Sequence, residues 1–226
     1  MLDNAQIAED IEKMVEYIGR QDIAKSAEAS RLAHLILDEI LAFVKPGVRE
    51  SEVKNFAFSR YEAHAIERPW HMPYIRFGEH TLLNYKQKAK EDLVLQDNDI
   101  AFADIGTVKN GYEGDAGRTI AFGSNKELQR LADTSKILFD EMTAYWRNNR
   151  PTGQQLYDMT YEATKKHGFV FNLDGAGHLI GEFPHKGWKH GMSNFPNVIE
   201  DGGWVLEIQI RHPTLAYGAF FEDLLH

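Results

Sequence analysis

The stretch that decides the fold reads Ala103-Asp104-Ile105-Gly106, then Asn110-Gly111-Tyr112, then Gly114-Asp115-Ala116-Gly117-Arg118-Thr119. The apolar run 100–105 predicts a strand, residues 109–114 predict a hairpin turn, and residues 119–122 predict the returning strand. The side chains of Asp104 and Asp115 can then project from adjacent strands into one pocket. Two carboxylates held so close need a cation between them, or one must take up a proton. Because Asp is also common in turns, this segment alone leaves an ordinary strand end and turn as the alternative.

A glycine-rich stretch in the second half supplies two imidazoles. Residues 175–181 read Gly-Ala-Gly-His-Leu-Ile-Gly, which sets His178 among glycines, and His185 follows shortly after. Flanking glycines let an imidazole approach an ion or a substrate without a bulky neighbour in the way. Both histidines are therefore candidates for the same site as the aspartates.

Two strand-like segments near the end of the chain add more polar groups. Residues 205–210 alternate apolar and polar side chains, which places Glu207 and Gln209 on one face of a strand. Glu222 lies in the last apolar segment. A carboxylate in an apolar strand is costly to bury unless it is paired or bound to metal. These residues complete a set of acidic and imidazole groups that suits a metal site.

In chain order, these segments resemble the pita-bread metallopeptidase superfamily, which includes methionine aminopeptidase, prolidase, aminopeptidase P and creatinase. The order Asp, Asp, His, Glu, Glu carries the resemblance, which covers roughly residues 20–226. The resemblance implies an α+β fold with a curved antiparallel sheet, helices outside it and a pseudo-twofold relation between the halves. It also implies one or two divalent ions, drawn from Mn, Fe, Co and Zn, that activate a water molecule.

By this resemblance, Asp104, Asp115 and His178 would be metal ligands, Glu222 would bridge two ions, and His185 would contact the substrate or a developing oxyanion. The identity of the fourth ligand is open between two residues. Aligning the strand that begins at Gly203 on the family pattern puts Gln209, a neutral donor, at the ligand position. Glu207 shares its face and can supply a carboxylate instead.

A second departure from the family lies upstream of the first aspartate. Asn84 stands where prolidase-like members have a histidine that takes part in catalysis. Asn donates a hydrogen bond but cannot titrate near neutrality. We therefore place Asn84 at the catalytic position and expect His80 or His71 to supply an imidazole from nearby.

Further residues are candidates for contact with the substrate. Tyr74 and His71 belong to an aromatic cluster that either lines a pocket or fills the rim of the core. Lys186 directly follows His185, where many peptidases of this family have an acidic residue, and a cation there suits an anionic group. Arg211 lies between the last two proposed ligands and can likewise hold a carboxylate.

Composition sets looser bounds. At 226 residues and 43% hydrophobic content, the chain is long enough for one sizeable core. We expect residues 1–226 to form a single domain, without the additional amino-terminal domain of prolidase and creatinase. The sequence has no cysteine, so any metal must be held by oxygen and imidazole. The net charge of −9 argues against a nucleic-acid partner, because phosphate contacts need clustered Lys and Arg.

The sequence also gives expectations about location and assembly. The start, Met1-Leu2-Asp3-Asn4, lacks a basic region followed by an apolar one, and no run approaches membrane-spanning length. We therefore expect a cytoplasmic protein with no membrane partner. Dimers are common among members of the family, so the resemblance also raises a homodimer, which no pattern in this sequence tests.

Apolar residues at three- and four-residue intervals predict helices over 5–18, 22–43, 51–65, 128–148 and 154–167. Pro46 and Pro151 mark the turns that separate the paired helices of each half. Each half then reads helix, turn, helix and strands. This internal repetition favours a pseudo-twofold α+β fold with the site between the halves.

The candidate ligands suit metal-dependent hydrolysis of an amide in a small substrate. The resemblance implies that the reaction is that of an aminopeptidase or an Xaa-Pro dipeptidase. A creatinase-like enzyme acting on a small metabolite is the close alternative, and Asn84, Gln209 and Lys186 favour it. A catalytically silent binding protein is the third option. Catalytically silent members of the family usually lose several ligands together, whereas Asp104 and Glu222 are both present here.

Overall fold

The structure is a computed structural model that describes residues 4–174, 176–185, 188 and 190–226. Within these residues, seven strands form one sheet in the order β1-β2-β3-β7-β6-β4, with β5 paired to β6. Every pairing is antiparallel. The strands are β1 Tyr74–Phe77, β2 Ile100–Lys109, β3 Tyr112–Ala121, β4 Val170–Phe171, β5 Gly177–Leu179, β6 Trp204–Arg211 and β7 Gly218–Leu224.

The long hairpin of β2 and β3 reverses over Asn110 and Gly111 alone. Both residues have positive φ, 52° and 75°, which suits the tight turns whose twist matches paired strands. The predicted turn over 109–114 and the predicted returning strand over 119–122 are therefore wrong in extent. Because the turn takes only two residues, β3 begins at Tyr112, and Asp115 lies within a strand rather than in a turn.

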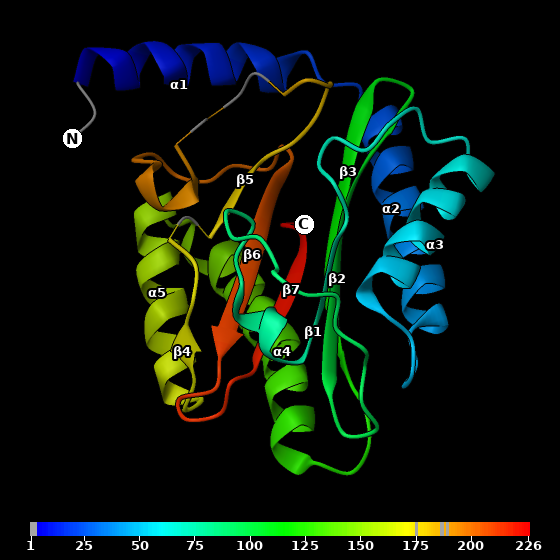
Figure 1. Ribbon diagram of the computed structural model, residues 1–226. Helices are drawn as coiled ribbons and strands as arrows, with labels where there is room; N and C mark the ends of the chain where they lie inside the picture. The colour runs from blue at the N-terminus through cyan, green and yellow to red at the C-terminus, as the bar shows by residue number, and fades with distance from the viewer. Residues whose placement is uncertain (1–3, 175, 186–187, 189) are drawn as a thin grey trace.

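Helices cover the outer face of the sheet in two pairs (Figure 1). The first pair, α2 (Ile23–Phe43) and α3 (Glu50–Ala63), packs on β1 to β3. The second pair, α4 (Lys126–Asn149) and α5 (Gly153–Lys166), packs on β4, β6 and β7. β3 and β7 are neighbours at the middle of the sheet, so the strand order mirrors itself about this pair. The predicted α+β fold, with helices outside an antiparallel sheet and a pseudo-twofold arrangement, is confirmed.

The helices begin where the sequence offers capping side chains. Asp22 accepts hydrogen bonds from the first backbone N–H groups of α2, and Asn125 does the same for α4. Thr152 forms a reciprocal capping box with Gln155 at the start of α5. The remaining helix, α1 (Asn4–Gly19), lies across one end of the sheet (Figure 1). None of the described helices combines the length and hydropathy that a bilayer crossing requires.

Strand alternation divides the side chains between the two faces of the sheet. Ala103 and Ile105 of β2 belong to the apolar core under α2 and α3, and Ile208 of β6 belongs to the core under α4 and α5. Period two therefore sends Asp104 and Glu207 to the opposite face, which the helices leave open. This inner face carries the candidate site.

Candidate metal centre

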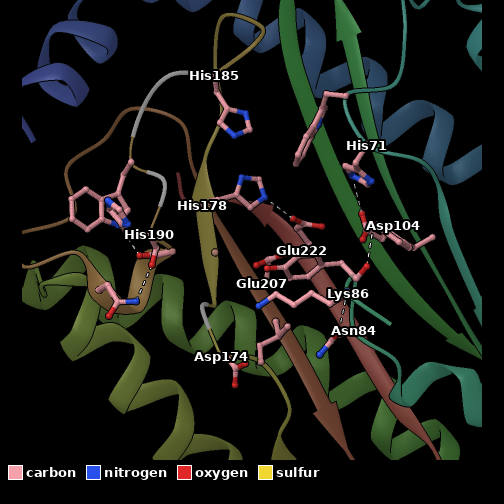
Figure 2. Close-up of a pocket in the computed structure, with 18 residues that line it drawn as sticks. His71, Asn84, Lys86, Asp104, Asp174, His178, His185, His190, Glu207 and Glu222 are labelled. Carbon is pink, nitrogen blue, oxygen red and sulfur yellow. Dashed lines mark hydrogen bonds and ion pairs between the residues drawn. The ribbon is translucent and has the colours of Figure 1, made fainter. Parts of the chain in front are cut away.

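A cavity of about 500 Å³ lies on the inner face of the sheet and draws its lining from both halves of the chain (Figure 2). Three of its acidic residues come from three different strands: Asp104 from β2, Glu207 from β6 and Glu222 from β7. His178 from β5 and His185 from the following loop line the same cavity. The fold therefore brings together groups that lie far apart in the sequence.

The register of the central hairpin places the two aspartates side by side. Asp104 lies opposite Gly117, and Asp115 lies opposite Gly106, so the two carboxylates are diagonal neighbours on one face. Each glycine also makes room for a neighbour. A Cβ on Gly106 would overlap the ring of His71, and one on Gly117 would overlap the ring of Phe220. Glycine at these two positions therefore leaves room for the rings of His71 and Phe220 beside the aspartates.

The second half of the chain supplies the remaining acidic and imidazole groups. Glu207 and Glu222 lie directly opposite each other across β6 and β7, and Gly117 pairs Glu222 to β3. The Nε2 atom of His178 lies 3.2 Å from Asp115 Oδ2 and 3.4 Å from Glu222 Oε1. Ligand atoms of Asp115, His178 and Glu222 all lie within 4.8 Å of one another, which is close enough to hold one ion.

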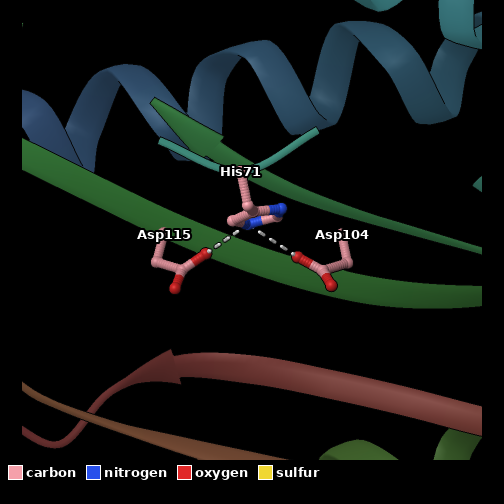
Figure 3. A group of neighbouring side chains, drawn as sticks. All are labelled: His71, Asp104 and Asp115. Carbon is pink, nitrogen blue, oxygen red and sulfur yellow. Dashed lines mark ion pairs between the residues drawn. The ribbon is translucent and has the colours of Figure 1, made fainter. Parts of the chain in front are cut away.

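A second group shares Asp115 with the first. The Nε2 atom of His71 lies 3.4 Å from Asp104 Oδ1 and 3.5 Å from Asp115 Oδ1. Ligand atoms of His71, Asp104 and Asp115 also lie within 4.8 Å of one another (Figure 3). The centre therefore contains two adjacent groups of three residues joined by one carboxylate.

The chemistry of these groups fits divalent cations. Several of their ligand atoms are buried yet make no hydrogen bond: Asp104 Oδ1, both oxygens of Asp115, Glu222 Oε2 and Nδ1 of His178. Buried polar atoms are normally paired, and an unpaired buried carboxylate oxygen is costly. Ions would pair the carboxylate oxygens. The donor set of carboxylates and imidazoles suits Mn, Fe, Co and Zn.

Burial and neighbouring charges shift the pKa values of the clustered carboxyl groups in opposite directions. Burial raises the pKa of Asp104 to about 7, although His71 acts against it. Burial and the charge of Asp115 raise the pKa of Glu222 well above its ordinary value. Burial also acts to raise the pKa of Asp115, but the imidazoles of His178 and His71 lower it to about 2. Without bound cations, the cluster must therefore hold protons to balance its charge.

One tryptophan, Trp70, packs against three imidazoles of the site. The ring of Trp70 lies 4.4 Å from the ring of His71, 5.3 Å from that of His178 and 5.5 Å from that of His185, measured between centroids. Its Nε1–H donates to the backbone carbonyl of Gly114, 3.2 Å away. Trp70 therefore fixes the separation between the imidazoles and the strand that carries Asp115.

His185 is held by a carboxylate that the sequence reasoning did not single out. Glu113 is fully buried, and both of its oxygens lie 2.9 Å from His185 Nδ1. It also accepts hydrogen bonds from the backbone N–H groups of His185 and Gly181. Because a carboxylate only accepts, Nδ1 of His185 carries the proton and Nε2 is left for the cavity. Period two from Asp115 along β3 is the signal that places Glu113 on the same face.

Other residues predicted for the site fall into two groups. Asn84 and Tyr74 line the cavity. His80 does not, because its ring is buried against Glu50, with Nδ1 3.0 Å from that carboxylate. Arg211 is exposed at the end of β6, paired with β4 and β7, and does not line the cavity either. Lys186 lies outside the described residues.

The open choice between Glu207 and Gln209 separates clearly in the structure. Glu207 lines the cavity together with the other acidic groups. Gln209 is buried, and its Nε2–H donates to the backbone carbonyls of Leu83, 3.1 Å away, and Thr81, 3.4 Å away. Glu207 is therefore the better placed of the two to hold an ion.

The sequence is similar to a metallopeptidase family and to two of its named relatives. The model of metallopeptidase family M24 matches residues 24–226. A methionine aminopeptidase from Aquifex aeolicus is 23% identical over 205 residues, which cover 84% of this chain and 75% of that protein. The uncharacterized peptidase YqhT of Bacillus subtilis is 24% identical over 207 residues, covering 90% of this chain and 57% of that protein.

The fold is also similar to that of a solved peptidase structure. An Xaa-Pro dipeptidase from Bacillus anthracis superimposes with a TM-score of 0.73 at 24% identity, covering 88% of this chain and 56% of the other. This chain thus spans little more than half the length of the dipeptidase and of YqhT. Because the family model extends over most of the chain, from residue 24 to residue 226, the chain belongs to metallopeptidase family M24.

Proposed function

We propose that this chain hydrolyses an amide bond of a small peptide, as an aminopeptidase or an Xaa-Pro dipeptidase does, with divalent metal ions bound at the inner face of the sheet. The observation that carries the proposal is the cluster of buried carboxylate oxygens without hydrogen bonds beside His178. When bound, such ions polarise the scissile carbonyl and lower the pKa of a coordinated water. The named relatives supply the two substrate classes.

Six side chains would hold the ions and the substrate in this proposal. Asp104, Asp115, His178, Glu207 and Glu222 would bind manganese, iron, cobalt or zinc, since the chain offers only oxygen and imidazole donors. His185 would face the substrate through Nε2, because Glu113 holds its Nδ1. Donation from Nε2 to the reacting carbonyl oxygen would require a ring that carries a proton on both nitrogens. A ring fixed from behind in this way keeps its orientation during the reaction.

The size and walls of the cavity limit the substrate. A volume of about 500 Å³ suits a dipeptide or the end of a short peptide rather than a folded protein. Trp188 and Tyr74 supply apolar walls, whereas Lys86 and Asn194 supply polar ones. Because ligands and walls come from both halves of one sheet, we further propose that residues 1–226 act as one catalytic unit.

A creatinase-like reaction on a small metabolite is a second candidate, and the polar side chains of Asn84 and Lys86 in the cavity wall favour it. Asn84 lines the cavity where relatives of prolidase type have a titrating imidazole, and its Oδ1 accepts from the backbone N–H of Lys86, 3.0 Å away. An amide in that position cannot exchange a proton with a leaving amine. The ammonium of Lys86 in the cavity wall also suits a substrate with its own anionic group.

Hydrolysis assays decide between the two candidates. The purified chain is loaded in turn with Mn²⁺, Fe²⁺, Co²⁺ and Zn²⁺. It should then cleave Xaa-Pro dipeptides or peptides with amino-terminal methionine, and the newly released amine measures the cleavage. Asp115→Asn removes the charge shared by both groups of ligands and should abolish cleavage. Lys126→Ala, at the exposed start of α4, is the matched control and should leave cleavage unchanged. Full metal loading without cleavage of either peptide class would reject the peptidase and leave the metabolite enzyme.

A further inference from the structure

His71 occupies a position that the family resemblance does not assign to a metal ligand. It lies in the segment that leads into β1, far in sequence from the other ligands. Its Nε2 atom nevertheless lies close to both aspartates of the hairpin, 3.4 Å from Asp104 Oδ1 and 3.5 Å from Asp115 Oδ1 (Figure 3). The ring is mostly buried, with 16% of its side chain exposed.

The orientation of the ring suits a ligand. Nδ1 of His71 lies 2.9 Å from the carbonyl oxygen of Met72, and a carbonyl only accepts, so Nδ1 carries the proton. In the neutral ring, Nε2 then presents its lone pair to the two carboxylates. Metal-bound histidines almost always donate their other N–H to a carbonyl or a carboxylate in this manner, which fixes both the tautomer and the ring plane.

The surroundings are shaped for this ring. Gly106 lies opposite Asp115, and any side chain there would overlap Cδ2 and Nε2 of His71. Trp70 packs edge-on at 4.4 Å and Tyr74 stacks at 5.5 Å, so the ring is held from two further sides.

We propose that Nε2 of His71 is a direct ligand of the ion that Asp104 and Asp115 share. The inference rests on the proposed metal-dependent function. Each ion would then have its own imidazole: His71 with Asp104 and Asp115, and His178 with Asp115 and Glu222. Ligand atoms 3.4 to 3.5 Å apart can reach one ion with bonds of about 2.1 Å.

The extra nitrogen has a consequence for metal choice. Mg²⁺ and Ca²⁺ prefer oxygen ligands, whereas imidazole favours Zn, Fe, Co and Ni. A site of one imidazole and two carboxylates should therefore discriminate against Mg²⁺ more strongly than the carboxylates alone. The competing interpretation is that a protonated His71 ring takes the place of the ion and bridges the two aspartates itself.

Metal titration separates the two interpretations. We would titrate the metal-free wild type, His71→Ala and His71→Asn with Mn²⁺ by calorimetry and count bound ions by elemental analysis. Wild type should bind two ions, and His71→Ala should bind one of them about 100-fold more weakly or not at all, because loss of a direct ligand should cost at least as much as loss of its supporting partner. His167→Ala, which removes an imidazole paired with Glu141 far from the cavity, should behave as wild type.

Two results would overturn the assignment. Unchanged affinity in both His71 variants would show that the ring is not a ligand, and a higher ion count in His71→Ala would show that the ring had occupied the site as a cation. Thermal unfolding of the metal-free variants identifies any that fail to fold, in which case the paired His71→Asn result decides. His71→Asn keeps polar atoms in the same space and should retain part of the affinity.

A spectroscopic readout does not depend on catalysis. In the Co²⁺ form, the Nδ1–H of a bound His71 should give a strongly shifted proton resonance that exchanges slowly, because it is hydrogen-bonded to Met72. That resonance should be missing in His71→Ala, and its presence there would contradict the assignment. If wild type cleaves no peptide but binds two ions and shows the resonance, the proposed reaction fails while the ligand assignment stands.

Discussion

Glu207 and Gln209 are near neighbours on β6, but their side chains have different surroundings. They point to the same face of β6, two residues apart; Gln209 is buried, and Glu207 is half-buried at the cavity wall. Glu207 meets the acidic cluster, and burial raises its pKa. Gln209 instead donates to the carbonyls of Thr81 and Leu83, which ties the short 3₁₀ helix Gly78–Leu82 and its C-cap to β6. One is suited to hold an ion and the other to hold the backbone.

Substitution of Glu207 should therefore weaken metal binding, whereas substitution of Gln209 should lower stability. We expect Glu207→Gln to weaken Mn²⁺ binding at least about tenfold, because it removes a charge beside the ion, with little loss of stability in the metal-free form. Gln209→Ala should leave Mn²⁺ affinity unchanged and lower the free energy of unfolding by about 1–3 kcal/mol, because it leaves buried carbonyls unpaired. Calorimetric titration and urea unfolding measure the two quantities. The opposite pattern would make Gln209 the ligand.

Much of the site could be predicted at this scale, and the exceptions have a common cause. Asp104, Asp115, His178 and Glu222 lie in segments whose glycines and alternation mark them locally, and the structure gathers all four. His71, expected to contact the substrate, lines the cavity and also approaches both aspartates, which its sequence did not indicate. His80 is paired with Glu50. No local pattern tells where a histidine in an irregular segment will point, because the tertiary contacts of that segment decide it.

At the scale of elements, helices were easier to predict than strands. The helices predicted over 22–43 and 128–148 agree closely with α2 and α4, because apolar periodicity and capping residues both mark them. The strand β3 was predicted too short. Its residues 112–118 include two glycines and lack alternation, since this strand is buried on both faces between α2 and the cavity.

One contact joins α2 to the middle of the sheet and depends on pH. Nε2 of His34 on α2 lies 2.9 Å from Asp223 Oδ1 on β7, and this hydrogen bond raises the pKa of His34 although burial opposes it. The folded state therefore binds the proton more tightly than the unfolded state. The resulting stability is present below the ordinary pKa of about 6.5 and is lost as the pH rises through the higher, folded-state pKa.

We expect His34→Gln to destabilise the chain more at pH 5.5 than at pH 9, by up to about 1 kcal/mol, a typical value for a partly exposed ion pair. Midpoints of urea unfolding for both proteins at both pH values measure the difference. Asp223→Asn is the matched control, and in that background the His34 substitution should lose its pH dependence. An equal or larger effect at pH 9 would contradict the assigned sign.

At the scale of the whole molecule, the site lies where the two halves of the fold meet. Asp104 and Asp115 come from the hairpin of the first half, and His178, Glu207 and Glu222 come from strands of the second half. One apolar core lies under α2 and α3, and the other lies under α4 and α5 and also takes in Met14, Tyr17 and Ile100. Bound ions would therefore bridge the two halves of the sheet, and the free energy of ion binding would add to the stability of their junction.

The central claim is that these distant side chains converge on divalent ions, and anomalous diffraction from crystals of the Mn²⁺-loaded protein tests it most directly. We predict one anomalous peak in contact with Asp115, His178 and Glu222, and a second in contact with Asp104, Asp115 and His71. A map with full Mn²⁺ in the crystal solution and no peak within coordination distance of Asp115 would contradict the account.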